Sequence, residues 1–326
     1  MYAHPHIPLV VLALALTCTF TVAAQDSIPA SEIPTYHSAV SEVRITFFAT
    51  DDNNHSVATL SKSDVAVVDD EHVVRNFRNF THSEETSLDV VALVDLSESV
   101  APSHQTAMND VLQMIAREQS IPSDNISVLS FGGALAGPSA ATSKGASASL
   151  RPAVLCSSAC SDSVGRLMAV KSSGATPLFD ALLFAADFIA HHRRAGARPV
   201  LILFSDGNDT ISLHSSAEAL EAVLDGGALI YSVDLGTARQ QTSGSAFLRR
   251  VSEATGGRYF SLPASKDDGA AAILSAALDD LRASYVVSYD VPSHQAGFHS
   301  LRVLPTHNLN LKFHSRNGYN YEPNDR

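Results

Sequence analysis

One apolar run constrains the fold of this chain more than any other feature: LDVVALVDL, at residues 88–96. A run this long, with almost no polar alternation, is typical of a strand that is covered on both faces, as in the centre of a parallel sheet. Four further strands are expected, at NISVLSFGG, PVLILFSDG, ALIYSVDLG and GRYFSLP, and helical spacing recurs between them at residues 103–118, 178–192, 215–224, 247–257 and 267–284. This alternation predicts that residues 86–284 form an α/β domain, a doubly wound and mostly parallel sheet with helices on both faces.

The two segments that flank this centre have a different pattern of short strands separated by turn residues. An N-terminal β segment is expected over residues 38–84 and a C-terminal one over residues 285–320, with strands at SEVRITFFATDD, HSVATL, DVAVVDD, HVVRNFRNF, SYVVSYDV, GFHSLRVLP and LNLKFHSR. About seven strands is the number used by a sandwich of the immunoglobulin type. We therefore predict one flanking β-sandwich, formed from the N- and C-terminal strands, with the α/β domain inserted into it. The acidic run Asp69-Asp70-Glu71 is interpreted as a hairpin turn.

Side chains with hard oxygen atoms gather where two of the predicted central strands end. Oxygen ligands at the carboxyl edge of such a sheet suit Mg²⁺ or Mn²⁺, with one ion per chain. An alternative is that the serines only cap the next helix and the aspartates are solvated strand ends. The candidate metal ligands are Asp95, Ser97, Ser99, Thr176 and Asp206.

These segments, in this order, resemble the metal-ion-dependent adhesion site of the von Willebrand factor type A domain. The resemblance rests on Asp-x-Ser-x-Ser after a buried strand, Gly-x-Thr-Pro-Leu-x-Asp-Ala before a helix, and an apolar strand that ends in Ser-Asp-Gly. Looser features of the flanks are similar to exported bacterial proteins of the acidobacterial-type von Willebrand factor A-related group. The resemblance implies a Rossmann-like fold and a protein partner whose Asp or Glu reaches the metal.

Partner choice is expected to depend on residues around the metal, namely Glu98, His104, Ser173, Pro177, Asn208 and Asp209. We do not expect an enzyme, because the sequence has no phosphate-binding Gly-x₄-Gly-Lys-Ser/Thr loop, nucleophile elbow or His-Glu-x₂-His helix. Two alternatives stay open. One is a structural component of an envelope or appendage with a purely stabilising metal, and the other is a metal-dependent hydrolase with Asp209 as base.

The N-terminus indicates an exported protein. Residues 1–24 carry the apolar run and small-residue ending of a secretory signal peptide, which predicts a secreted or cell-envelope location and no transmembrane segment after cleavage. An uncleaved anchor is the alternative reading of this run. Of the three cysteines, Cys156 and Cys160 would remain after cleavage and are expected to form a local disulfide. The formal net charge of −12 argues against a nucleic-acid partner.

Overall fold

The computed structural model describes residues 42–83, 86–118, 125–132, 152–156, 168–236, 242–261 and 269–322, together with four positions between 160 and 165. The predicted signal peptide and the first residues of the N-terminal β segment lie outside the described residues. Within the described ranges, no helix is long and apolar enough to span a bilayer.

The central sheet has six strands in the order β10-β9-β8-β5-β6-β7. All neighbours pair in parallel except β7, which runs antiparallel to β6 at one edge. Every residue of β5 and of β8 is buried, which explains the continuous apolar runs Val90–Val94 and Val200–Phe204 in their centres. The strands are β5 (Leu88–Asp95), β6 (Asn125–Phe131), β7 (Ala153–Cys156), β8 (Arg198–Ser205), β9 (Leu229–Asp234) and β10 (Tyr259–Ser261).

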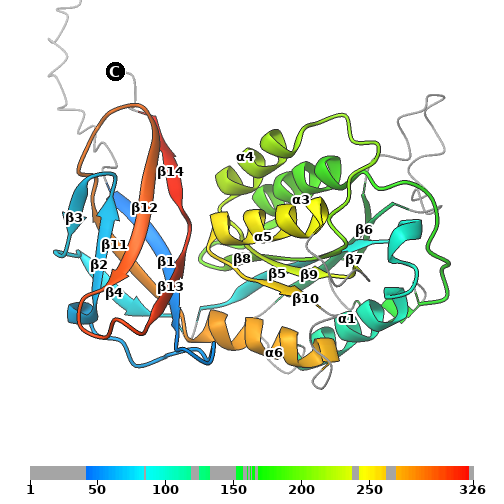
Figure 1. Cartoon of the computed structure of the whole chain (residues 1–326), viewed down its shortest axis with the longest axis horizontal. Helices are drawn as coiled ribbons and strands as arrows, with labels where there is room; N and C mark the ends of the chain where they lie inside the picture. Colours follow the sequence, from blue (N-terminus) through cyan, green and yellow to red (C-terminus); the bar gives the residue numbers. More distant parts are fainter. Residues whose placement is uncertain are drawn as a thin grey trace, which may run out of the picture. The chain divides into compact units, whose positions relative to one another are not determined.

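Helices cover both faces of this sheet (Figure 1), with α3, α4 and α5 on one face and α1 and α6 on the other. Local sequence signals determine where helices begin and end, as α4 illustrates. Ser215 accepts the N–H of Glu218 at the start of α4, and Gly227 ends that helix in the left-handed region at φ 68°. The helices are α1 (His104–Glu118), α3 (Leu178–His192), α4 (Ser216–Gly226), α5 (Ser243–Thr255) and α6 (Gly269–Arg282).

Two four-stranded antiparallel sheets are built from the flanks, in the orders β13-β1-β11-β4 and β14-β12-β2-β3. Each combines strands from before and after the α/β domain. Inward side chains of both sheets, such as Phe47, Val67, Val287 and Val303, share one hydrophobic core. The strands are β1 (Glu42–Thr50), β2 (Val65–Asp69), β3 (His72–Val74), β4 (Asn79–His82), β11 (Tyr285–Asp290), β12 (Gly297–Pro305), β13 (Lys312–Ser315) and β14 (Gly318–Tyr321).

The predicted fold class, a doubly wound α/β sheet with flanking β-sheets from both ends, is confirmed. Some details of the prediction were wrong. HSVATL forms no strand, because only Ser56 makes a bridge, to Thr50, and the segment is otherwise irregular. HVVRNFRNF divides into β3 and β4, which belong to different sheets. The edge strand β7 and the final strand β14, of four residues each, were not predicted.

Candidate metal centre

Asp95 is the last residue of β5, and its side chain is held from both sides. One carboxylate oxygen, Oδ1, accepts the backbone N–H of Ser97 at 2.8 Å, and Oδ2 accepts the hydroxyl of Ser205 at 2.7 Å. Asp95 is fully buried. A carboxylate that is fixed and buried in this way is preorganised to meet a cation at the carboxyl edge of the sheet.

The side chain of Ser97 does not cap the next helical turn, as the alternative reading required. Ser97 precedes a 3₁₀ turn, Glu98–Val100, but its side chain makes no capping hydrogen bond. Its hydroxyl lies instead 3.2 Å from the hydroxyl of Ser99. Two neutral oxygen donors are therefore adjacent, two and four residues after the carboxylate of Asp95.

Asp206 directly follows β8, the strand that pairs with β5. It is 6% exposed, and its Oδ1 accepts the N–H of Asn208 at 3.1 Å. Burial raises the pKa of Asp95 to about 6, and the negative charge of Asp206 adds to this effect, whereas hydrogen bonds from Ser97 and Ser205 oppose it. The two strand ends thus bring buried negative charges close enough to repel, and a cation between them would relieve that repulsion.

Thr176 comes to the same edge on the loop before α3, and it is 2% exposed. Its backbone N–H donates to the hydroxyl of Thr210 at 2.7 Å, and its carbonyl accepts the N–H of Thr210 at 2.9 Å. The same loop is joined to the β5 loop, because Glu98 donates its N–H to the carbonyl of Gly174 and Ser173 donates to that of Leu96. All three segments that carry candidate ligands are therefore linked by backbone hydrogen bonds.

Gly132, just after β6, is a supporting residue that sequence reasoning missed. It adopts φ +71°, and a Cβ at this position would lie 3.1 Å from the backbone nitrogen of Ser97 and 3.4 Å from Oδ1 of Asp95. Both the backbone conformation and the close approach favour glycine. The glycine pair that ends the predicted strand NISVLSFGG was the sequence signal for this position.

The residues predicted to surround the metal differ in exposure. Glu98 and Asn208 are exposed, and Ser173 and Asp209 are half-buried. His104 and Pro177, by contrast, are buried, so neither offers a partner much surface. We therefore correct the predicted contact surface by removing these two residues from it.

Both carboxylate oxygens of Asp209 accept hydrogen bonds from the protein, which argues against its role as the base of a hydrolase. Its Oδ2 accepts the N–H of Phe179 at 3.1 Å and the hydroxyl of Ser212, and its Oδ1 accepts the N–H of Ser212 at 3.2 Å. These bonds tie the loop after β8 to the start of α3. Asp209 therefore fixes the conformation of the loop and accepts a free N–H of the first turn of α3, as aspartates near helix N-termini often do.

The donor set fits a hard divalent ion. Two carboxylates balance the charge of Mg²⁺ or Mn²⁺, and three hydroxyls supply neutral oxygen ligands of the kind these ions accept. Burial raises the pKa of Asp95, so the hydrogen bonds from Ser97 and Ser205 do not fully compensate its buried charge. The residues that would hold the ion are Asp95, Ser97, Ser99, Thr176 and Asp206.

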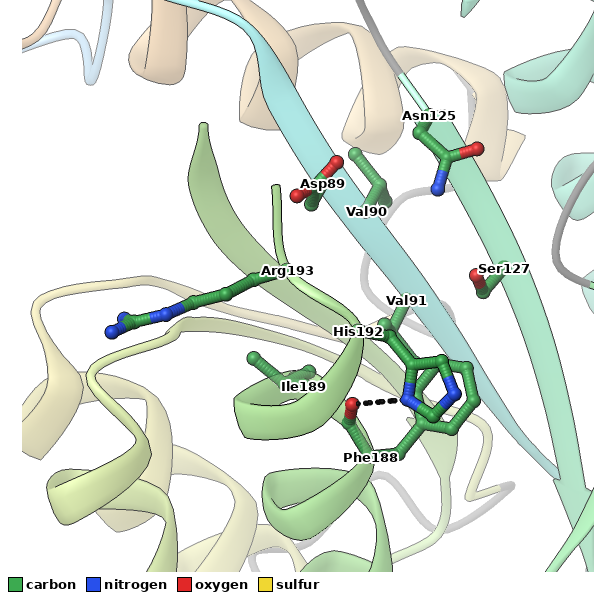
Figure 2. A pocket seen from close by; sticks show the side chains of 9 residues that line it. All are labelled: Asp89, Val90, Val91, Asn125, Ser127, Phe188, Ile189, His192 and Arg193. Atoms are coloured by element: carbon green, nitrogen blue, oxygen red, sulfur yellow. Dashed lines mark hydrogen bonds between the residues drawn. The ribbon is translucent and has the colours of Figure 1, made fainter. Parts of the chain in front are cut away.

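Two other structural features are a disulfide and a small cavity. Cys156, the last residue of β7, is joined to Cys160 by a disulfide. A small cavity of about 20 Å³ lies near the amino ends of β5 and β6. Figure 2 shows the side chains that line it, among them Asp89, Asn125 and His192. His192 Nδ1 lies 2.8 Å from the carbonyl of Phe188 there. The cavity is too small for more than a water molecule.

Comparison with known proteins gives one match by family and several by structure. The model of the von Willebrand factor type A domain matches residues 89–270, which is more than half of the 326-residue chain. A comparison with curated proteins gives no match.

Three solved structures illustrate the structural matches. An aerotolerance-related membrane protein from Bacteroides fragilis is 13% identical, with 60% of this chain and 98% of that chain covered and a TM-score of 0.39. Proximal thread matrix protein 1 from the mussel byssus, with a zinc-occupied MIDAS motif, is 14% identical, with 65% and 50% covered and a TM-score of 0.44.

The third is the pilus adhesin SpaC from Lactobacillus rhamnosus GG, 9% identical, with 84% and 47% covered and a TM-score of 0.44. The matched region thus spans about half the length of the mussel and pilus proteins. These identities and scores are too low to transfer any property of those proteins to this chain.

Proposed function

Because the chain belongs to the von Willebrand factor type A domain family, we propose that it is an exported, metal-dependent protein-binding module of the adhesion type. Its site would take Mg²⁺ or Mn²⁺ and accept an Asp or Glu side chain of a partner protein. One observation supports this proposal: the buried carboxylates of Asp95 and Asp206 follow adjacent parallel strands, and the loops that carry the three hydroxyls are hydrogen-bonded together.

The charge balance of the donor set favours binding of an acidic partner. Asp95 and Asp206 neutralise a divalent ion, whereas the three hydroxyl ligands add no charge. A divalent ion bound here would supply the attraction for a partner carboxylate, and further anionic ligands would weaken it. Ser205 and the backbone of Ser97 hold Asp95 in place, so partner binding would not require this carboxylate to reorganise.

The surface next to the site is small and polar. Glu98 and Asn208 are exposed on the loops that follow β5 and β8, and Ser173 and Asp209 are half-buried beside them. We propose that these four residues contact the partner and set its identity. His104 and Pro177 would act only through the packing beneath the loops.

Export is part of the proposal. It is supported by the signal-like sequence of residues 1–24 and by the disulfide between Cys156 and Cys160, which suits an oxidising compartment. We further propose that the protein is not an enzyme. The alternative of an envelope or appendage component with a purely stabilising metal rests on the same ligands, so binding experiments have to separate the two.

The first experiment is calorimetric titration of Mg²⁺ and Mn²⁺ into chelator-treated protein. We expect about one ion per chain, with binding lost in Asp95→Ala and Asp206→Ala. Asp187→Ala is the matched control, because Asp187 is an exposed aspartate on α3 with a side chain that is 71% exposed. Folded wild-type protein that binds neither ion would refute the site.

A second experiment separates adhesion from stabilisation. Immobilised wild-type protein is screened against peptides with a single Asp or Glu in neutral surroundings, with Mg²⁺ and then with chelator. The adhesion proposal expects chelator-sensitive binding that disappears when the peptide carboxylate is replaced by an amide. A metal that raises the melting temperature, but never changes peptide binding, would support the structural alternative.

A further inference from the structure

Three side chains with metal-binding atoms meet in the β-sandwich, away from the strand-end site. Asp69 ends β2, Asp70 lies in the β2–β3 turn, and His299 lies on β12. Leu301 of β12 is the register partner of Asp69, so His299, two residues earlier, projects from the same face of the sheet. One ligand atom from each of the three residues lies within 4.8 Å of the others.

Each of these side chains is anchored through its other polar atom. His299 Nε2 lies 2.8 Å from the carbonyl of Gln295, an acceptor, so this nitrogen carries a proton. Asp70 Oδ1 accepts both the N–H and the hydroxyl of Ser300, at 2.8 and 3.1 Å. In metal sites, the ligating histidine usually donates its second N–H to a carbonyl or carboxylate, and ligating carboxylates are themselves hydrogen-bonded.

Asp69 is anchored in the same manner. Its Oδ2 accepts the hydroxyls of Tyr289 and Tyr319, at 2.8 and 3.0 Å. Burial, together with the carboxylate of Asp69, raises the pKa of both phenols, so both stay protonated and donate. The ring of Tyr319 also stacks on the imidazole of His299, with centroids 5.0 Å apart. The orientation of Asp69 is therefore fixed by two donors.

The remaining atoms of the three side chains face one another. His299 Nδ1 is 2.9 Å from Asp70 Oδ2 and 3.9 Å from Asp69 Oδ1. Asp69 is 1% exposed, and its Oδ1 has no hydrogen-bond partner within the part of the chain that the structure describes. His299 Nδ1 is likewise buried and has no hydrogen-bond partner there, so a proton on it would lie near Asp70 Oδ2 and leave Asp69 Oδ1 without compensation. A cation that bonds to all three atoms would satisfy the whole cluster.

We propose that Asp69 Oδ1, Asp70 Oδ2 and His299 Nδ1 form a second metal site, for a divalent ion of the zinc class. An imidazole nitrogen with two carboxylate oxygens is a ligand set for Zn²⁺, which commonly adds water as its fourth ligand. Imidazole is not a preferred ligand of Mg²⁺ or Ca²⁺. The Asp70 side chain is 38% exposed, which leaves one side of the cluster open to the ion and to water.

The two sites of the chain would therefore differ in metal class. The strand-end site has oxygen donors only, whereas the sandwich site includes a nitrogen. Metal in the sandwich site would join β2, the β2–β3 turn and β12 through their side chains, in addition to their backbone pairing. This inference does not rest on the proposed adhesion function, since none of its residues belongs to the strand-end site.

The test measures Zn²⁺ binding by the full chain in an Asp95→Asn, Asp206→Asn background, which removes both carboxylates of the other site. We expect about one Zn²⁺ per chain by metal analysis after dialysis. Asp70→Asn and His299→Gln should each weaken binding at least tenfold. Co²⁺ in place of Zn²⁺ should give visible d–d absorption that His299→Gln alters, because a nitrogen ligand is lost.

The matched control is His307→Gln. His307 Nδ1 also lies near a carboxylate, 3.6 Å from Asp64 Oδ1, but its side chain is 69% exposed and it belongs to no three-ligand cluster within the described residues. Its substitution should leave Zn²⁺ binding unchanged. If His299→Gln does not fold, the half-exposed Asp70 position decides the question. Equal affinity in Asp70→Asn, an equal loss in His307→Gln, or no Zn²⁺ bound by the folded background protein would overturn the proposal.

Discussion

Neutralising Asp95 should stabilise the metal-free protein. Burial is the main cause that raises the pKa of this carboxyl from 3.8 to about 6. At about 1.4 kcal/mol per pKa unit, this difference corresponds to about 3 kcal/mol of unfolding free energy. The favourable contribution of the protonated carboxyl is fully present below pH 3.8 and is lost as the pH rises through 6. Metal-free wild type therefore carries the cost of a buried charge at neutral pH.

In Asp95→Asn this cost disappears. The amide oxygen can still accept the N–H of Ser97, but the amide nitrogen cannot accept the hydroxyl of Ser205 as Oδ2 does. One lost hydrogen bond costs about 1 kcal/mol. We therefore expect the variant to be about 2 kcal/mol more stable than wild type at pH 7.5 without metal, and to lose this advantage at pH 4.

The assay is urea unfolding with chelator at pH 4, 5, 6 and 7.5, repeated with Mg²⁺. Mg²⁺ should stabilise wild type and leave Asp95→Asn unchanged, because only a bound ligand shifts the unfolding equilibrium. Asp187→Asn, at an exposed position, should follow wild type at every pH. A variant that is less stable than wild type in chelator at pH 7.5 would show that the reasoning from buried charge is wrong.

Three further changes test other parts of the structure. Gly132→Ala should destabilise the fold by about 1–3 kcal/mol and weaken Mg²⁺ binding, because φ is +71° and the new Cβ would approach Ser97; calorimetry and thermal melting measure both, and an unchanged affinity would contradict it. Arg258→Ala should cost about 3–5 kcal/mol in urea unfolding, because it removes the partner, at 2.9 Å, of the fully buried Asp280; a loss below 1 kcal/mol would argue against a buried pair. Burial, reinforced by the charges of Arg258 and Lys312, lowers the pKa of His314 from 6.5 to about 4, so stability should fall as the pH drops from 6.5 to 4, and His314→Gln should reduce this fall in melting temperature relative to wild type.

The sequence predicted the central sheet well because burial on both faces makes a strand visible as a continuous apolar run. β5 and β8 are the best examples, since all their residues are buried. The short edge strands β7 and β14 have few residues and partly exposed faces, so their pattern is weak. HSVATL was misassigned because β-branched residues alone do not supply a pairing partner.

The candidate metal ligands of the strand-end site could be identified from the sequence because each follows a recognisable strand or precedes a recognisable helix. The sandwich cluster was not. Asp69 and Asp70 appeared only as a hairpin turn, and nothing local indicates that His299, far along the chain, pairs beside them. That proximity depends on the register of β2 and β12, which a single sequence does not reveal.

The position of the α/β domain within the sandwich has a consequence for the order of assembly. β1 pairs with β11 and β13, and β4 pairs with β11, so both wait for strands that are synthesised after the α/β domain. Among the described strands of the N-terminal flank, only β2 and β3 pair with each other locally. During synthesis the edges of β1 and β4 therefore stay open while roughly 200 residues are added, a loop whose closure alone costs about 5 kcal/mol. Folding of the α/β domain brings the ends of that loop together. It therefore lowers the entropic cost of pairing β1 and β4 with β11.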